Sequence, residues 1–251
     1  MRRLGDGQRL RNRPWMSWGM AVLAAYALKL HYSRASAEDL AWILVPTARA
    51  VGWLRGETLS LSPGAGWVAP DGSYVIAPAC AGVNFMILGL TVSVLGFAHR
   101  LRSPGSRLSW WLASLGGAYV LTIAVNTLRI LAAVELYRLD PVAWLTPEQG
   151  HRLLGAALYL AALWGVFAVL DGLTAQGRAG ARSMLVAAVL VPGAYLGMTV
   201  VVPLLNGASR RPGGQYVEHA MMVSLVALAP AGALALLFLA RRVATKMREK
   251  T

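Results

Sequence analysis

The segment from Gly82 to Ala98 reads GVNFMILGLTVSVLGFA and carries no aspartate, glutamate, lysine or arginine. About 20 apolar residues let a helix cross the hydrocarbon core of a bilayer, so this segment is a candidate transmembrane helix. Five other stretches have the same character: 15–30, 109–134, 152–170, 183–205 and 221–240. Membrane-spanning β-strands would run about 10 residues and alternate in polarity, which none of these stretches does. The sequence therefore predicts an all-α, polytopic transmembrane helix bundle of about six spans.

The overall composition indicates the same class of protein. Of the 251 residues, 57% are hydrophobic and only 14% are charged, which excludes an ordinary water-soluble domain. The chain contains no internal repeat, low-complexity tract or linker between domains. We expect residues 1–251 to form a single integral membrane domain.

Basic and acidic residues are distributed unevenly between the two sets of loops. Fifteen of the 24 lysines and arginines lie before the first stretch, after the last, or in the loops that follow the second and fourth. Eight of the eleven acids lie in the other loops. By the positive-inside rule, both termini are then cytoplasmic and the acidic loops are extracytoplasmic. Because the net charge of +13 is explained by orientation in the membrane, we do not expect nucleic acid as a partner.

Two segments between the first and second stretches need a separate interpretation. Residues Leu40–Leu54 are apolar but short, and Pro46 and Arg49 interrupt them. A span here would move every later loop to the other side, so a short interfacial or re-entrant helix fits the charge pattern better. The following loop alternates in polarity and has turn residues at Pro63 and Asp71, which predicts a small extracytoplasmic hairpin.

The N-terminal stretch has two possible fates. It follows a basic leader and precedes Ala35-Ser36-Ala37, which resembles a signal-peptidase site. Lys29 and His31 separate this site from the apolar run, so an uncleaved membrane anchor fits the sequence better.

Cys80 is the only cysteine, and the predicted topology places it on the extracytoplasmic side. A lone thiol in an oxidising compartment has no partner within its chain. Pro78 favours a helix start, so Cys80 is expected in the first helical turn, where backbone N–H groups stabilise a thiolate. Gly82 would permit a close approach of backbone or substrate. The alternative is that Cys80 is an inert, small residue that fills space in a membrane helix.

Arg129 lies inside the third apolar stretch, about one turn before its outer end. An arginine at mid-depth costs at least about 2.5–3.5 kcal/mol and therefore usually faces a partner or a wet cavity. Asn126 lies three residues earlier, on the same helix face. This pair indicates a polar patch inside the bundle, although Arg129 could instead reach the outer headgroups.

His151 begins the fourth apolar stretch, also on the outer side. An imidazole gives and takes protons near neutrality, as nucleophilic cysteine chemistry requires. His31 and His219 lie on the same side and are competing candidates for this base, whereas His99 is expected on the cytoplasmic side. The outer histidines do not have the spacing of a metal site, and we expect neither a metal nor an organic cofactor.

The predicted positions of Cys80, Arg129 and His151 agree in depth although the three residues belong to three different helices. Together they supply a nucleophile, a fixed cation for a developing oxyanion, and a proton carrier. The sequence therefore predicts a catalytic site at the extracytoplasmic edge of the bundle.

The order of these motifs resembles the exosortase/archaeosortase family of membrane cysteine transpeptidases. The matching features are Ala79-Cys80-Ala81-Gly82 opening one span, Asn126-x-x-Arg129 in the next, and His151 opening the one after. The resemblance covers about residues 40–170 and leaves the spans at 183–205 and 221–240 as additions. The family pattern more often has serine after the cysteine. The chain is similar to the short forms of the family, near the subgroup called exosortase K.

The resemblance implies a concrete function. Such enzymes sit in the bacterial cytoplasmic membrane and act on secreted proteins whose C-terminus carries a short motif, a transmembrane helix and a basic cluster. They cleave near the motif and transfer the protein to an acceptor, which this sequence does not identify. Cys80 would be the nucleophile, His151 the general acid and base, and Arg129 the oxyanion or thiolate partner. Asn126 would hold Arg129, and Asn84, one turn past Cys80, would line the pocket.

Two other classes of function stay open at this point. A small-solute transporter would carry polar residues along a path through mid-membrane, often with broken helices, and Pro192 and Pro203 are the main irregularities of that kind. A non-catalytic membrane assembly subunit would need no aligned cysteine, arginine and histidine.

Overall fold

The computed structural model describes residues 14–101, 103–138, 146–174, 181–207, 216–230 and 232. These residues are mostly helical, and they belong to two compact units, Met1–Ala179 and Gly180–Thr251. The two units are treated separately below.

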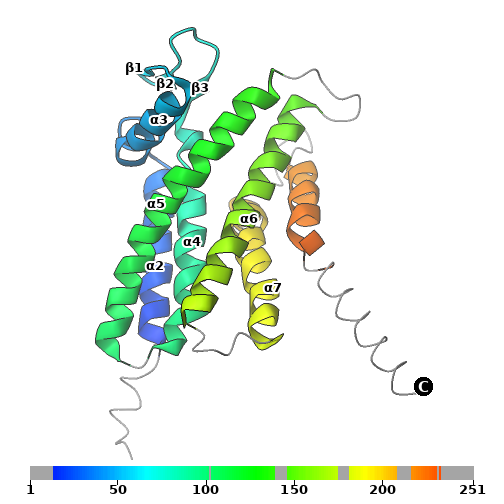
Figure 1. The fold of residues 1–251 in the computed structure, drawn as a ribbon. Coiled ribbons are helices and arrows are strands. Elements are labelled where there is room, and N and C mark those ends of the chain that lie inside the picture. The colour runs from blue at the N-terminus through cyan, green and yellow to red at the C-terminus, as the bar shows by residue number, and fades with distance from the viewer. Residues whose placement is uncertain are drawn as a thin grey trace, which may run out of the picture. The chain divides into compact units, whose positions relative to one another are not determined.

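The described residues of the first unit form five α-helices, a small sheet and two 3₁₀ turns (Figure 1). In chain order they are α2 (Trp15–Tyr32), α3 (Ala41–Arg55), β1 (Ser60–Ser62), β2 (Gly66–Val68), β3 (Val75–Ile76), η1 (Pro78–Cys80), α4 (Val83–Phe97), η2 (Ala98–Arg100), α5 (Pro104–Leu136) and α6 (Pro147–Thr174).

Helix α4 is the central helix of this unit and packs against α2, α5 and α6. Burial covers 78% of the most apolar window of α4 and its flanks, against 39% for α5 and 28% for α6. Phe85, Leu90 and Phe97 are fully buried on α4. A helix that is apolar on all sides belongs inside a bundle, while its neighbours leave one face for lipid. The apolar segment from Gly82 to Ala98 thus forms the core of this unit.

Helices α5 and α6 are the two longest elements and run antiparallel beside α4 (Figure 1). Ser103 caps α5 by accepting a hydrogen bond from the backbone N–H of Ser106, and the side chain of Ser106 accepts a hydrogen bond from the backbone N–H of Ser103. Pro104 follows as the first helical residue, where its missing N–H costs nothing. These signals fix the start of a helix that continues for 33 residues to Leu136.

Helix α3 and the sheet lie at the end of the bundle where α4 begins and α5 ends (Figure 1). Gly56 ends α3 in the left-handed conformation, with φ of 70°. The sheet is antiparallel in the order β1-β2-β3, with Leu61 opposite Trp67 and Trp67 opposite Ile76. At 15 residues, α3 is shorter than the roughly 20 residues of a typical transmembrane helix.

The second unit contains α7 (Ala181–Leu196), a π-helical turn (Gly197–Val201), α8 (Val202–Leu205) and a helix at Tyr216–Pro230. Pro192 lies within α7, and Pro203 lies in the first turn of α8. The Tyr216 hydroxyl donates a hydrogen bond to the backbone carbonyl of Val200 at 2.9 Å.

Four described helical segments are long and apolar enough to cross a membrane: Pro78–Arg100, Gly105–Leu136, Pro147–Thr174 and Ser183–Leu205. They correspond to four of the six expected spans, and their length and composition indicate a membrane protein. The stretch 15–30 coincides with α2, which is not among the four. Only part of 221–240 is described, and its later residues lie outside the described ranges.

Candidate functional site

Cys80 is the last residue of the 3₁₀ turn η1 and does not belong to α4, whose first residue is Val83. Cys80 thus lies in the first turn of the candidate span Pro78–Arg100, and this turn is 3₁₀-helical, not α-helical. Its backbone N–H donates to the carbonyl of Ala77 at 2.8 Å. Gly82 separates the turn from the helix because its φ of 73° is a left-handed conformation that interrupts regular helical geometry. Pro78 thus starts a short turn that carries the cysteine.

Gly82 also lets the Cys80 turn approach α5 closely. A Cβ atom at this position would lie 3.0 Å from Cγ2 of Thr122 and 3.1 Å from Cγ of Asn126. The atoms nearest to Gly82 are thus side-chain atoms of α5, whereas the sequence predicted the approach of a backbone or a substrate. This contact fixes the position of the cysteine turn against the helix that carries Arg129.

Asn126 connects the cysteine turn to the rest of the site. Its side chain is completely buried, and its Nδ2 donates a hydrogen bond to the backbone carbonyl of Cys80. Its Oδ1 accepts a hydrogen bond from the Tyr159 hydroxyl at 2.9 Å. Both ends of the amide are therefore satisfied, as a buried polar group in a membrane protein requires.

Arg129 lies one turn beyond Asn126 on α5 and reaches across to α6. Its guanidinium lies 3.0 Å from Nε2 of His151 and 3.5 Å from the hydroxyl of Tyr159. The guanidinium carbon also lies 5.5 Å from the centre of the Tyr159 ring. Arg129 thus contacts protein groups on α6.

The side chain of Arg129 passes directly over Gly155. A Cβ atom at Gly155 would lie 2.8 Å from Nε of Arg129, too close for the present arrangement. Within the described ranges, four ion pairs connect arginines with carboxylates, and none of them includes Arg129. Its positive charge has an imidazole and a phenol as neighbours, and none of the carboxylates that the structure describes forms an ion pair with it.

The contact between Arg129 and His151 fixes the tautomer of the imidazole. A guanidinium has only donors, so Nε2 of His151 must be the acceptor and the ring proton lies on Nδ1. Nδ1 is buried and has no hydrogen-bond partner in the described part of the chain. The ring of His151 also lies 6.1 Å from that of Tyr137.

Cys80, Arg129 and His151 line one cavity of about 270 Å³. Its wall is completed by side chains from the end of α5 and from the segment before η1: Ser73, Tyr74, Val75, Ile130, Ala133, Val134, Tyr137 and Arg138. The three predicted residues therefore share a single space at the α3 end of the bundle. Among the described residues, none makes a hydrogen bond to the sulfur of Cys80, so the thiol faces this space without a fixed partner.

Asn84 lies outside this cavity wall. Its Oδ1 accepts a hydrogen bond from Nζ of Lys29 on α2 at 2.9 Å. The expected place of Asn84 in the pocket is therefore taken by other residues. His31 is exposed and lines a separate hollow with residues of α2 and the loop after it. His219 belongs to the second unit.

The sequence interpretation missed two tyrosines beside the cysteine. Tyr159 joins Asn126 and Arg129 and stacks on Phe85 with ring centres 4.6 Å apart. Tyr32, at the end of α2, places its hydroxyl 3.5 Å from the carbonyl of Ala79. A signal for Tyr159 exists in the sequence, because His151, Gly155 and Tyr159 recur every four residues on one face of a helix. Tyr32 has no such signal.

A polar cluster at the rim of the cavity joins the end of α3 and the loop after it, residues 55–74, to the end of α5. Arg55 pairs with Glu57 at 2.6 Å and with Glu135 at 3.1 Å, and the Tyr74 hydroxyl donates to the carboxylate of Glu57. That hydrogen bond, and then Arg55, lower the pKa of Glu57. Burial and the same hydrogen bond raise the pKa of Tyr74. Tyr74 lines the cavity, so this cluster holds one wall in place.

The described residues contain no group of three or more histidine, cysteine, aspartate and glutamate side chains that could hold a metal ion. Comparison of the chain with protein-family models, with curated proteins and with solved structures found no match. The resemblance to exosortases and archaeosortases therefore depends on the motifs around Cys80, Arg129 and His151, and it stays a prediction.

Proposed function

We propose that this chain is a membrane-embedded cysteine transpeptidase of the exosortase/archaeosortase type. It cleaves a C-terminal sorting signal of secreted proteins at the extracytoplasmic face of a bacterial cytoplasmic membrane and transfers them to an acceptor. The observation that supports this proposal is the 3.0 Å contact between Arg129 and His151 in the cavity that also holds Cys80. Asn126 ties the backbone of the cysteine to the same group of residues.

The first step is attack by Cys80 on a peptide carbonyl of the substrate. As the carbonyl enters the cavity, Arg129 exchanges its contact with His151 for the developing oxyanion. Nε2 of His151 is then free to accept the proton of the thiol, and the sulfur forms a bond to the carbonyl carbon. The result is a tetrahedral intermediate whose negative oxygen faces a guanidinium.

The second step breaks the peptide bond and leaves a thioester. His151 returns its proton to the leaving nitrogen, the carbon–nitrogen bond breaks, and the C-terminal fragment departs as an amine. An acceptor amine, hydroxyl or water then loses a proton to His151 and attacks the thioester carbonyl. When this second tetrahedral intermediate collapses, the sulfur leaves and regains the proton from His151. Electrons and protons balance without a metal or an organic cofactor.

Arg129 is expected to increase the rate by stabilising the oxyanion. Removing one donor from an oxyanion site typically costs about 10²–10³ in kcat, or about 2.7–4 kcal/mol. The absence of a carboxylate partner for Arg129 within the described residues supports this role, because a paired guanidinium would be less available to an oxyanion. Tyr159 and Gly155 keep its side chain in position.

The three C-terminal parts of the expected substrate can be matched to the bundle and its cavity. We expect its transmembrane helix to lie against the bundle, its basic cluster to remain cytoplasmic, and its scissile bond to reach the cavity at the extracytoplasmic end. Helix α3 and the loop after it, residues 56–77, cover that end of the bundle. We expect them to contact the part of the substrate that lies outside the membrane.

The test is co-expression with a secreted reporter that ends in a motif, a transmembrane helix and a basic cluster, taken from a neighbouring gene. Cys80→Ala, Cys80→Ser, Arg129→Ala and His151→Ala are compared with wild type, and His31→Ala is the matched histidine control. We expect processing to be lost in the first two variants, to fall at least about a hundredfold in the other two, and to persist in the control. Unchanged processing in all four active-site variants refutes the proposal. Solute flux that survives Cys80→Ala would favour a transporter, and an intact assembly function without all three residues would favour a non-catalytic subunit.

A further inference from the structure

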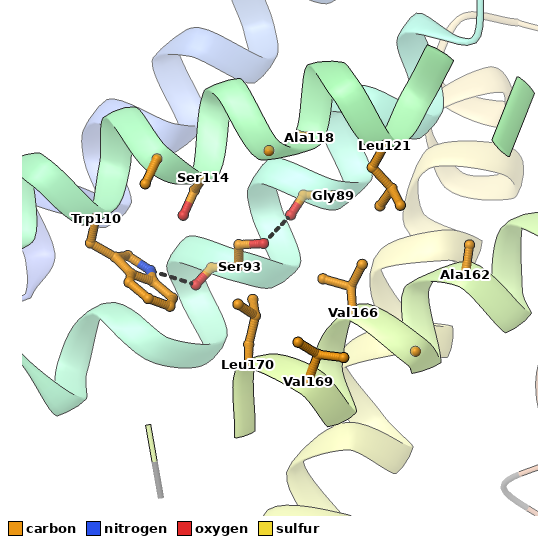
Figure 2. Close-up of a pocket in the computed structure, with 13 residues that line it drawn as sticks. Gly89, Ser93, Trp110, Ser114, Ala118, Leu121, Ala162, Val166, Val169 and Leu170 are labelled. Carbon is orange, nitrogen blue, oxygen red and sulfur yellow. Dashed lines mark hydrogen bonds between the residues drawn. The ribbon is translucent and has the colours of Figure 1, made fainter. Parts of the chain in front are cut away.

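A second hollow lies on the first unit, away from the cysteine cavity. It is an apolar groove of about 480 Å³ formed by α4, α5 and α6 (Figure 2). Small residues from each helix line it, among them Gly89 on α4, Gly117 and Ala118 on α5, and Ala162 and Gly165 on α6. Such residues let the backbone of a further helix come close, which is how helices associate in membranes.

Ser114 gives the groove a polar feature that lipid would not satisfy. Only 8% of the surface of this residue is exposed, and its hydroxyl points into the space between the three helices (Figure 2). Among the described residues it has no hydrogen-bond partner. The nearby Ser93, by contrast, donates to the carbonyl of Gly89 and accepts Nε1–H of Trp110 on its own carbonyl. The acyl chain of a lipid cannot form a hydrogen bond with the Ser114 hydroxyl. A helix that places a serine or threonine opposite Ser114 can.

The length of the groove matches its place in the membrane. On α5 the groove runs from Trp110 to Leu121, which is about 17 Å at 1.5 Å per residue. Arg129 lies about 12 Å further along the same helix. The distance from Trp110 to Arg129 is thus about 28 Å, close to the roughly 30 Å thickness of the hydrocarbon core. A helix seated in the groove and continuing along α5 leaves the membrane at the level of the cysteine cavity.

We infer that the groove between α4, α5 and α6 docks a single transmembrane helix of the substrate, through small residues on its facing side and a polar residue opposite Ser114. This inference rests on the proposed function for the identity of the partner. It adds the surface that holds the partner and the residue pattern that the surface selects.

The groove can be filled without disturbing the fold. Added Cβ atoms at Gly117 and Gly165 would meet no atom within 4 Å, so leucine at either position extends into open space. Gly116 and Gly172 are equally open and do not line the groove. Gly116→Leu and Gly172→Leu are therefore matched controls on the same two helices.

The test measures binding in the Cys80→Ala variant of the full chain, reconstituted in phosphatidylcholine vesicles. The probes are two synthetic transmembrane peptides with a photo-reactive leucine at mid-length, one with Gly or Ser at every fourth position and one with leucine there. Cross-linked residues are mapped by mass spectrometry. We expect the Gly/Ser peptide to label the groove, the label to fall at least tenfold in Gly117→Leu and Gly165→Leu, and the two controls to match the parent.

Equal labelling in the filled and control variants, or equal labelling by both peptides, overturns the inference. Labelling of the groove by a photo-reactive phosphatidylcholine that the Gly/Ser peptide does not displace overturns it as well. Failure of this inference is distinguishable from failure of the proposed function. Cys80-dependent processing with no peptide in the groove refutes the groove alone, and a peptide in the groove without Cys80-dependent processing refutes the enzyme alone.

Discussion

The substitution Gly155→Ala tests whether the position of Arg129 controls the proposed reaction. The new methyl group would lie 2.8 Å from Nε of Arg129, whereas ordinary contacts of a Cβ atom begin near 3.4 Å. The guanidinium must therefore move by about 0.6 Å or more, away from α6 and from its 3.0 Å contact with His151. Since a misplacement of about 1 Å in a catalytic site can cost about 10²-fold, we expect reporter processing to slow about tenfold.

The matched control is Gly172→Ala, on the same helix and outside the groove. Its added methyl group meets no atom within 4 Å, so it changes the helix in the same chemical way without touching the site. Processing rates of the two variants are compared at equal protein levels, with thermal unfolding in detergent measured in parallel. Equal rates in Gly155→Ala and Gly172→Ala would show that the reaction does not depend on Arg129 in its present position.

Two further predictions concern the hydrogen bonds that hold the site together. Tyr159→Phe removes the donor to Asn126 and is expected to destabilise the bundle by about 1 kcal/mol, measured as reversible unfolding in SDS. The control Tyr26→Phe, at an exposed tyrosine of α2, is expected to leave stability unchanged. Equal stability of the two variants would mean that the Tyr159 hydrogen bond contributes nothing. The hydrogen bond from Tyr74 to Glu57 should stabilise the cavity rim fully between about pH 4.3 and about pH 10, the ordinary pKa values of the two groups. The folded state lowers the pKa of Glu57 and raises that of Tyr74, so the stabilisation declines at lower and at higher pH. The difference in melting temperature between wild type and Tyr74→Phe should then shrink below about pH 4 and above about pH 10, and a difference independent of pH would contradict this.

Hydrophobic length predicted much of the fold. Four of the expected spans match helical segments of the structure that can cross a membrane, because a long apolar run in a bilayer has few alternatives to a helix. The break at Gly82 within the span Pro78–Arg100 was not predicted, for a local reason. Pro78 is compatible with any helical turn, and the left-handed conformation of Gly82 separates a 3₁₀ turn from the helix proper. A sequence shows the glycine but not the sign of its φ.

The candidate site was predictable as a set of residues but not as a network. Spacing placed Asn126 and Arg129 on one face of a helix, and the structure has both directed toward α6. The expected direct support of Arg129 by Asn126 runs instead through the hydroxyl of Tyr159. A tyrosine in an apolar helix has many possible roles, and only the packing of α5 on α6 gives it this one. The same packing makes Gly155 necessary.

The most direct test of the central claim is to detect the acyl-enzyme at the only cysteine of the chain. The full chain is incubated in vesicles with the reporter, quenched in acid, and analysed by intact and peptide mass spectrometry. We expect an adduct with the mass of the N-terminal reporter fragment on Cys80, joined by a thioester that neutral hydroxylamine releases. Processing of the reporter by the Cys80→Ala variant, with no adduct formed on the wild-type protein, would contradict the account.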